Sequence, residues 1–177
     1  MNAYADTGFL CSLYAPDGHS TIAAARMNRI ALPIPITWLH LLELRNALRL
    51  RVFRQEISST QRDASLNAML GDLAAGVLAH ADTPQAELSI EAERLSVQHS
   101  ETLGTRSLDI LHVAAALILG VPEFLTFDRR QHALALAAGL RSPNLLTQIK
   151  SASLNTGSST VPDKHTRFSV SSSHGKF

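Results

Sequence analysis

Cysteine is almost absent from this chain of 177 residues, in which Cys11 is the only one. A single cysteine excludes a framework of intrachain disulfide bonds and argues against a zinc site built from thiolates. No apolar run reaches the roughly 18 residues needed to cross a bilayer. The first residues also lack the basic and apolar regions of a signal peptide. These absences predict a cytoplasmic protein that does not enter a membrane.

An excess of charge of one sign is missing as well, because the formal net charge is only +1. The chain therefore has no general basic coat of the kind that binds duplex DNA indiscriminately. Lysine is scarce, so the positive charge is almost entirely arginine, whose planar guanidinium binds phosphate or carboxylate in a bidentate manner. The composition admits a nucleic acid or an acidic protein as partner and selects neither.

The length of the chain favours one domain with a real hydrophobic core. From residue 151 onward serine and threonine dominate, and apolar residues are too sparse to offset the entropy of ordering the chain. We therefore predict a folded domain over residues 1–150 and a disordered tail over residues 151–177.

Strands and helices alternate along the predicted domain. Prolines, glycines and cap residues separate the segments, and apolar spacing assigns their type. Strands are expected at 3–5, 32–36, 77–80, 123–127 and, weakly, 141–149, with helices at 7–14, 20–28, 38–54, 59–73, 84–100, 107–119 and 130–138. Such alternation predicts an α/β fold, a three-layer α/β/α sandwich with a mostly parallel central sheet.

Two helices carry more detailed expectations. Leu41, Leu44, Leu48 and Val52 form one apolar stripe on the helix over 38–54, and Trp38 before it is expected in the core or a dimer interface. Ser107 is the expected N-cap of the helix that contains Asp109, whose buried face is expected to include Leu108, Leu111, Ala115 and Leu119.

Four acids stand at predicted strand ends or on helices, and two of them lie at the edge where ligands bind in parallel sheets. Asp6 and Asp128 each end a predicted strand, Asp109 lies in the first turn of a helix, and Glu43 lies on another helix. Each acid also has a local explanation: Asp6 can cap a helix, Asp128 can cap one together with Gln131, and Asp109 suits a helix N-terminus. Glu43 can be an exposed helix glutamate that pairs with Arg45 or Asn46. If the four converge, charges about 4 Å apart repel by roughly 4 kcal/mol, and a hard cation such as Mg²⁺ or Mn²⁺ must compensate.

The motifs around these acids resemble those of the PIN domain, and their order and spacing are similar to the VapC toxins of toxin–antitoxin pairs. The similarity covers residues 1–147 and rests on Tyr-Ala-Asp-Thr at Asp6, Leu-Leu-Glu-Leu-Arg-Asn-Ala-Leu at Glu43, Arg-Ser-Leu-Asp-Ile-Leu-His-Val-Ala at Asp109, and Leu-Thr-Phe-Asp-Arg-Arg-Gln at Asp128. The resemblance implies a Mg²⁺- or Mn²⁺-dependent endoribonuclease with these acids as catalytic residues. It further implies that Asp6, Asp109 and Asp128 hold the metal, and that the chain is a homodimer neutralised by a cognate antitoxin.

The chain departs from the family pattern at two places. Gly8 stands where the family usually has a serine or asparagine supporting the first acid, which leaves Thr7 for that role. No fifth acid follows Asp128. Arg106 is expected to contact substrate phosphate or an acid of the site, and His112 to be a hydrogen-bonded helix histidine or a member of the site.

These departures keep two rival hypotheses open. One is a catalytically silent PIN fold that binds RNA or protein as a scaffold. The other is an unrelated α/β protein in which all four acids are helix caps that lie far apart.

Overall fold

Parallel strands form the centre of the computed structural model, which describes residues 1–147. β1 (Tyr4–Ala5) pairs in parallel with β4 (Phe124–Leu125), and β2 (Ile34–Ile36) pairs in parallel with β3 (Leu78–His80). β1 and β2 pack against each other without a hydrogen-bonded ladder, so the described strands form two pairs instead of one continuous sheet. The predicted α/β class with parallel strands is confirmed, and the sheet is narrower than expected.

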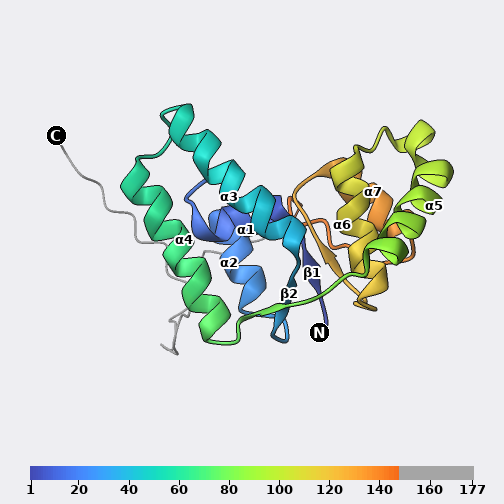
Figure 1. Ribbon diagram of the computed structural model, residues 1–177, viewed down its shortest axis with the longest axis horizontal. Coiled ribbons are helices and arrows are strands. Elements are labelled where there is room, and N and C mark those ends of the chain that lie inside the picture. The colour runs from blue at the N-terminus through green and yellow to red at the C-terminus, as the bar shows by residue number, and fades with distance from the viewer. Residues whose placement is uncertain (148–177) are drawn as a thin grey trace, which may run out of the picture.

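Seven helices within residues 1–147 surround these strands (Figure 1). Their positions agree with the segments expected from the sequence. They are α1 (Thr7–Tyr14), α2 (Ser20–Met27), α3 (Trp38–Phe53), α4 (Ser59–Ala74), α5 (Gln85–Leu103), α6 (Ser107–Ile118) and α7 (Arg129–Ala137).

The side chains of β1 alternate between two hydrophobic cores, which is what creates three layers. Ala5, together with Ala3 just before the strand, packs into a core formed mainly with α1 to α4, whereas Tyr4 packs into a second core formed with α5 to α7. Figure 1 shows the two groups of helices on opposite sides of β1 and β2. Consecutive residues of a strand point to opposite faces, so a strand this short can serve both cores.

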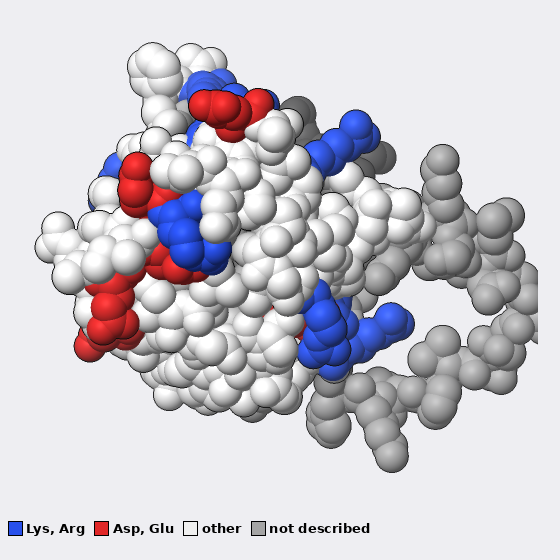
Figure 2. Space-filling view, turned by 90° about the vertical axis from the view of Figure 1, so that its right-hand side faces the viewer, with Lys and Arg blue, Asp and Glu red and all other residues white. Residues whose placement is uncertain are grey.

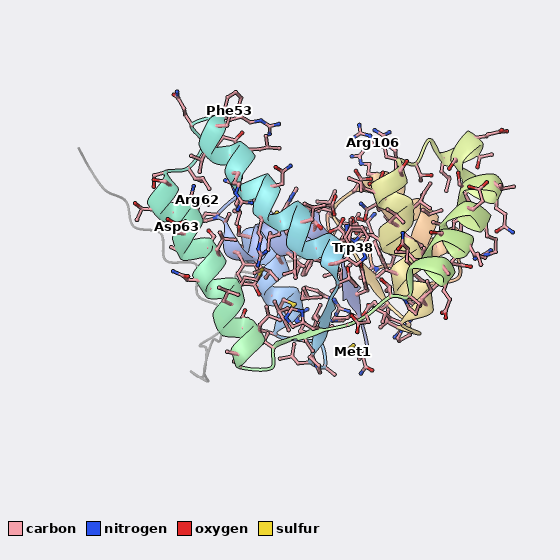
Figure 3. The ribbon with its side chains drawn as sticks, in the orientation of Figure 1. Met1, Trp38, Phe53, Arg62, Asp63 and Arg106 are labelled. Carbon is pink, nitrogen blue, oxygen red and sulfur yellow. The ribbon has the colours of Figure 1, made fainter. Side chains whose placement is uncertain are left out.

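Several local expectations are wrong. Arg106, and not Ser107, is the N-cap of α6, and Leu108 is 47% exposed because the buried face of α6 is centred on Ile110 and Val113. Trp38 is 53% exposed at the start of α3 (Figure 3), so it is not a core residue. On the same helix Leu44 and Leu48 are fully buried, and this part of the predicted stripe is confirmed.

The end of the described chain differs from the weak strand expected at 141–149. Only Arg141 forms a parallel bridge, with Glu123, and residues 142–147 contain no strand. The predicted boundary at residue 150 and the predicted tail over 151–177 lie outside the described residues. Within residues 1–147, no helix is both long enough and apolar enough to cross a membrane.

Figure 2 views the face built from α5, α6 and α7. Acidic and basic side chains lie on it with uncharged surface between them, so no extended field of one sign covers this face. That agrees with the nearly neutral composition.

Candidate functional site

Asp6 stands at the point where β1 passes into α1, and it is 2% exposed. Its Oδ1 accepts the backbone N–H of Phe9 at 2.7 Å, and its Oδ2 accepts the hydroxyl of Thr126 at 2.6 Å. Burial raises the pKa of Asp6, and the nearby carboxylate of Asp128 raises it further against the lowering effect of these hydrogen bonds. A positive charge beside Asp6 would therefore be favourable.

A chain of hydrogen bonds joins Asp6 to Asp128 and Asp109. Thr126 donates to Asp6 and accepts the backbone N–H of Asp128 at 2.9 Å, which ties the residue after β4 to the end of β1. Asp128 Oδ1 accepts the backbone N–H of Gln131 at 3.1 Å, and Gln131 Nε2 donates to Asp109 Oδ1 at 2.8 Å. Three acids from distant parts of the sequence thus belong to one network.

Each of these acids also accepts a backbone N–H at the start of a helix, as its position in the sequence predicted. Asp6 and Asp128 cap α1 and α7, and Asp109 Oδ2 accepts the backbone N–H of Arg106 at the start of α6. The expected box between Asp128 and Gln131 forms only in part, because the Gln131 side chain reaches to Asp109 instead of back to its own N-cap. The same three acids therefore bind helix N-termini and belong to one hydrogen-bond network.

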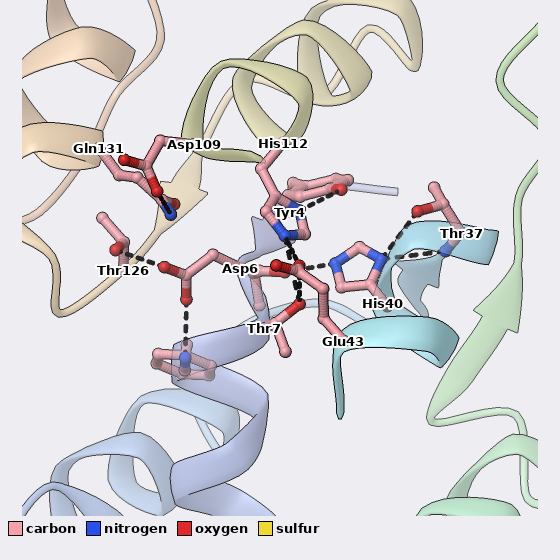
Figure 4. A network of polar contacts seen from close by, with 12 residues as sticks. Tyr4, Asp6, Thr7, Thr37, His40, Glu43, Asp109, His112, Thr126 and Gln131 are labelled. Atoms are coloured by element: carbon pink, nitrogen blue, oxygen red, sulfur yellow. Dashed lines mark hydrogen bonds and ion pairs between the residues drawn. The ribbon is translucent and has the colours of Figure 1, made fainter. Parts of the chain in front are cut away.

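Glu43 belongs to a second, neighbouring network (Figure 4). Its Oε2 accepts the hydroxyl of Thr7 at 2.7 Å and lies 2.5 Å from Nε2 of His112. Half-burial alone would raise the pKa of Glu43, but the hydrogen bond and charge of His112 and the Thr7 hydroxyl hold this pKa below its usual value. Thr7 therefore supports Glu43, whereas Thr126 supports Asp6, and the expectation that Thr7 supports the first acid is wrong.

His112 is buried and uses both ring nitrogens. Nε2 faces Glu43 and Thr7, while Nδ1 lies 2.9 Å from the hydroxyl of Tyr4 on β1. Burial raises the pKa of Tyr4, so its hydroxyl keeps its proton at neutral pH. Two alternatives were expected for His112, a hydrogen-bonded helix histidine or a member of the site. The structure shows a hydrogen-bonded helix histidine that also contacts Glu43 of the site.

His40 on α3 was not expected at the site, yet it locks α3 against β1. Its Nδ1 accepts the backbone N–H of Thr37 at 3.0 Å, and its Nε2 lies 2.8 Å from the carbonyl of Ala5, to which it must donate. This pattern requires the neutral ring, and burial together with nearby His112 lowers the pKa of His40 to about 3. His40 consequently holds Glu43, one turn further along α3, beside the end of β1.

Within residues 1–147, no arginine or lysine forms an ion pair with the three linked acids. Among residues 1–147, none of the five ion pairs involves Asp6, Asp109 or Asp128. The side chain of Arg106 forms no ion pair with an acid in that range either. Gln131 Oε1 is buried and has no hydrogen-bond partner in the described part of the chain, an arrangement that typically costs about 1–3 kcal/mol. The site therefore contains acceptors to which residues 1–147 supply neither a cation nor a hydrogen-bond donor.

The residue types fit a hard divalent cation, because all the side chains involved offer oxygen. Each carboxylate has about four acceptor positions, of which the protein uses two on Asp6, Asp109 and Asp128 alike. However, over the described part of the chain no three His, Cys, Asp or Glu side chains are gathered closely enough to hold a metal ion. Thr126 and Gln131 thus link the three acids, but in residues 1–147 the carboxylates do not form a metal-binding cluster.

Four residues that build this site were not expected there from the sequence. Each of them holds an acid, or a neighbour of an acid, in place: they are Tyr4, His40, Thr126 and Gln131. Thr126 carried a usable signal, since a threonine two residues before a capping aspartate often bonds the local backbone. The other three act over 22 or more residues of sequence, and no local pattern marks them.

Solved structures of other proteins share this fold. The VapC20 toxin of Mycobacterium tuberculosis, which cleaves the sarcin–ricin loop, is 18% identical with a TM-score of 0.59 over 78% of this chain and 96% of that one. FitAcB from Neisseria gonorrhoeae is 16% identical with a TM-score of 0.55, over 81% and 98%. VapBC2 from Rickettsia felis, bound to a DNA fragment from their promoter, is 15% identical with a TM-score of 0.55, also over 81% and 98%.

No family model matches the sequence, and no curated protein matches it. At identities this low the likeness establishes the fold alone. The PIN-like fold expected from the motifs is confirmed.

Proposed function

We propose that this chain is a metal-dependent endoribonuclease of the VapC toxin type, which hydrolyses phosphodiester bonds in RNA. The observation that carries the proposal is the network of Asp6, Asp109 and Asp128, which Thr126 and Gln131 join without any cationic partner in residues 1–147. The shared fold with a toxin that cleaves the sarcin–ricin loop supports the same conclusion. A nuclease of cellular RNA would act in the cytoplasm.

Asp6, Asp109 and Asp128 would hold Mg²⁺ or Mn²⁺. A bound divalent ion would supply positive charge for the scissile phosphate and lower the pKa of a coordinated water. The chain's own contribution is to orient the acids: Thr126 fixes Asp6, and Gln131 fixes Asp109.

Glu43 would act on the attacking water. His112 and Thr7 occupy its Oε2 and keep the carboxylate ionised, while Oε1 has no hydrogen-bond partner in the described chain. Oε1 is therefore the atom that can accept a proton from water. Since water, and not the ribose 2′-hydroxyl, attacks, the products should carry a 5′-phosphate.

The test is cleavage of purified ribosomal and transfer RNA by the full chain with Mg²⁺ or Mn²⁺, and with the metal chelated. Asp6→Asn and Asp109→Asn should each reduce cleavage by about 100-fold or more, with circular dichroism unchanged. Asp63→Asn on α4 is the matched control, because Asp63 is exposed and within residues 1–147 pairs only with Arg62. Full cleavage by both site variants would refute the proposal.

A silent PIN-like scaffold is the second candidate, and the open arrangement of the acids favours it. Calorimetric titration with Mn²⁺ separates the two candidates. Binding at one or two sites that Asp6→Asn abolishes supports the nuclease. A folded protein that binds no Mn²⁺ supports the scaffold.

An antitoxin partner and a homodimer belong to the same proposal. One face of α3 presents exposed Trp38, Leu42 and Phe53 together with Arg45 and Arg49. Such a face suits a partner segment with apolar and acidic side chains. Co-purification with the product of an adjacent short gene tests the first partner, and sedimentation equilibrium tests the dimer.

A further inference from the structure

A cleft of about 510 Å³ opens beside the carboxylate site, between the start of α7 and the segment 143–147. Residues 126–129, His132 and that segment line it. The cleft is continuous with the site, because Thr126 in its wall donates to Asp6 (Figure 4) and Asp128 belongs to both. Its volume lies within the range of about 300–1,000 Å³ typical of small-ligand sites.

The walls of this cleft are held by packing. Phe127 is stacked with His19, whose ring centroid lies 4.3 Å away, and with Phe9 at 5.5 Å. On the opposite wall Leu145 is buried in the core, and Thr147 donates its backbone N–H and its hydroxyl to Asn144. A wall fixed in this way is prepared for a ligand without further ordering.

Three polar side chains in the cleft have unused capacity. Arg129 is exposed and forms no ion pair within residues 1–147. His132 is held through Nδ1 by Ser142 at 3.0 Å, and its Nε2 has no partner in the same range. Asn144 uses its Oδ1 for Thr147, which leaves its amide N–H donors. A cation, an aromatic wall and amide donors together complement a nucleotide.

We propose that this cleft binds one unpaired nucleotide of the RNA next to the bond that is cut. Its phosphate lies at Arg129, and its base lies against Phe127 within reach of His132 and Asn144. Unpaired bases that pack on aromatic side chains and bond through their edges are the usual targets of sequence-specific RNA recognition. The inference rests on the proposed function, because it takes RNA as the substrate.

The experiment measures binding of a short single-stranded RNA to the full chain by fluorescence anisotropy, with metal chelated so that no cleavage occurs. Arg129→Ala should raise the Kd roughly tenfold and reduce the slope of log K against log salt by about 0.7. Asn144→Ala should raise the Kd roughly fivefold without changing that slope. Arg130→Ala is the matched control, because Arg130 donates to the Gly104 carbonyl and does not line the cleft. Its Kd should stay within about twofold of the wild type.

The outcomes separate this inference from the proposed nuclease. If Arg129→Ala and Asn144→Ala bind RNA as the wild type does while cleavage with Mn²⁺ persists, the cleft is not the nucleotide site and the nuclease stands. If binding depends on both residues but Mn²⁺ supports no cleavage, the cleft stands and the nuclease fails. If inorganic phosphate displaces the RNA as well as a nucleoside monophosphate does, no base is recognised and the inference is overturned.

Discussion

The buried histidine on α3 makes the stability of this protein depend on pH in a predictable direction. His40 is 1% exposed and neutral, with a pKa of about 3 that burial and nearby His112 depress from the usual 6.5. In the unfolded chain His40 takes up a proton as the pH falls through about 6.5, whereas in the folded chain it does not. Lowering the pH therefore favours the unfolded state until the folded pKa is reached.

The magnitude follows from the difference between the two pKa values. Each unit is worth about 1.4 kcal/mol, so the loss between about pH 7 and pH 4.5 is roughly 2.7 kcal/mol. Glu43 acts in the same sense at lower pH, because its folded pKa is also depressed and its contribution is lost as the pH falls through that value. Asp6 acts in the opposite sense, because its folded pKa is raised and the folded state takes up its proton first.

The variant His40→Gln separates the contribution of His40 to the pH dependence of stability from the contributions of Glu43 and Asp6. The variant should be about 1–3 kcal/mol less stable at neutral pH, because the buried carbonyl of Ala5 loses its donor, but the loss of stability on acidification should be smaller by roughly 2.7 kcal/mol. Urea unfolding at several pH values, followed by circular dichroism, measures both effects. His80→Gln at an exposed position of β3 is the control and should retain the wild-type pH dependence. Equal pH dependence in wild type and His40→Gln would refute the reasoning.

Three further changes test other parts of the structure. Gln131→Leu removes the donor to Asp109 and should weaken Mn²⁺ binding by about 10–100-fold in calorimetric titration; unchanged affinity would show that Gln131 does not orient Asp109. Gly8→Ala should raise the free energy of unfolding by about 0.5–1 kcal/mol, because alanine favours the helix α1 more than glycine does. The added Cβ would lie at an ordinary contact distance of 3.5 Å from Asp6 Oδ1. A destabilised variant would contradict this expectation. Leu48→Ala should lower the free energy of unfolding, measured in urea, by about 2–5 kcal/mol, because Leu48 is fully buried. Leu42 on the same helix is 61% exposed, so Leu42→Ala should lower it by less than about 0.5 kcal/mol. Similar losses in the two variants would contradict the burial pattern.

Much of the fold could be predicted because its helices are locally encoded. Caps, prolines and apolar spacing placed all seven described helices to within a few residues. The errors lie where packing overrides a local rule. Leu108 continues an apolar spacing but is exposed, since the buried face of α6 is set by which of its sides meets α5 and α7. Trp38 is apolar but lies on the outer side of α3.

The candidate site could be predicted only in part. The sequence predicted Asp6 directly after a strand and Asp109 at a helix start, and both predictions are confirmed. Asp128 was expected at the end of a strand, but β4 already ends at Leu125 and Asp128 is the N-cap of α7. The residues that hold the acids are not local: Thr126 reaches Asp6 across 120 positions of sequence, and Gln131 reaches Asp109 across 22. Whether the network binds a metal depends on side-chain geometry, which no spacing rule contains.

The sequence by itself determined which chemistry is available, because it supplies carboxylates and arginines and places acids where parallel strands end. Only the tertiary structure decided which groups share one environment. It paired Glu43 with His112, placed neutral His40 between α3 and β1, and left the other three acids without a cation in the described chain. The physical reason is that the charge state of a buried group depends on its neighbours in space, and the folded backbone alone brings those neighbours together.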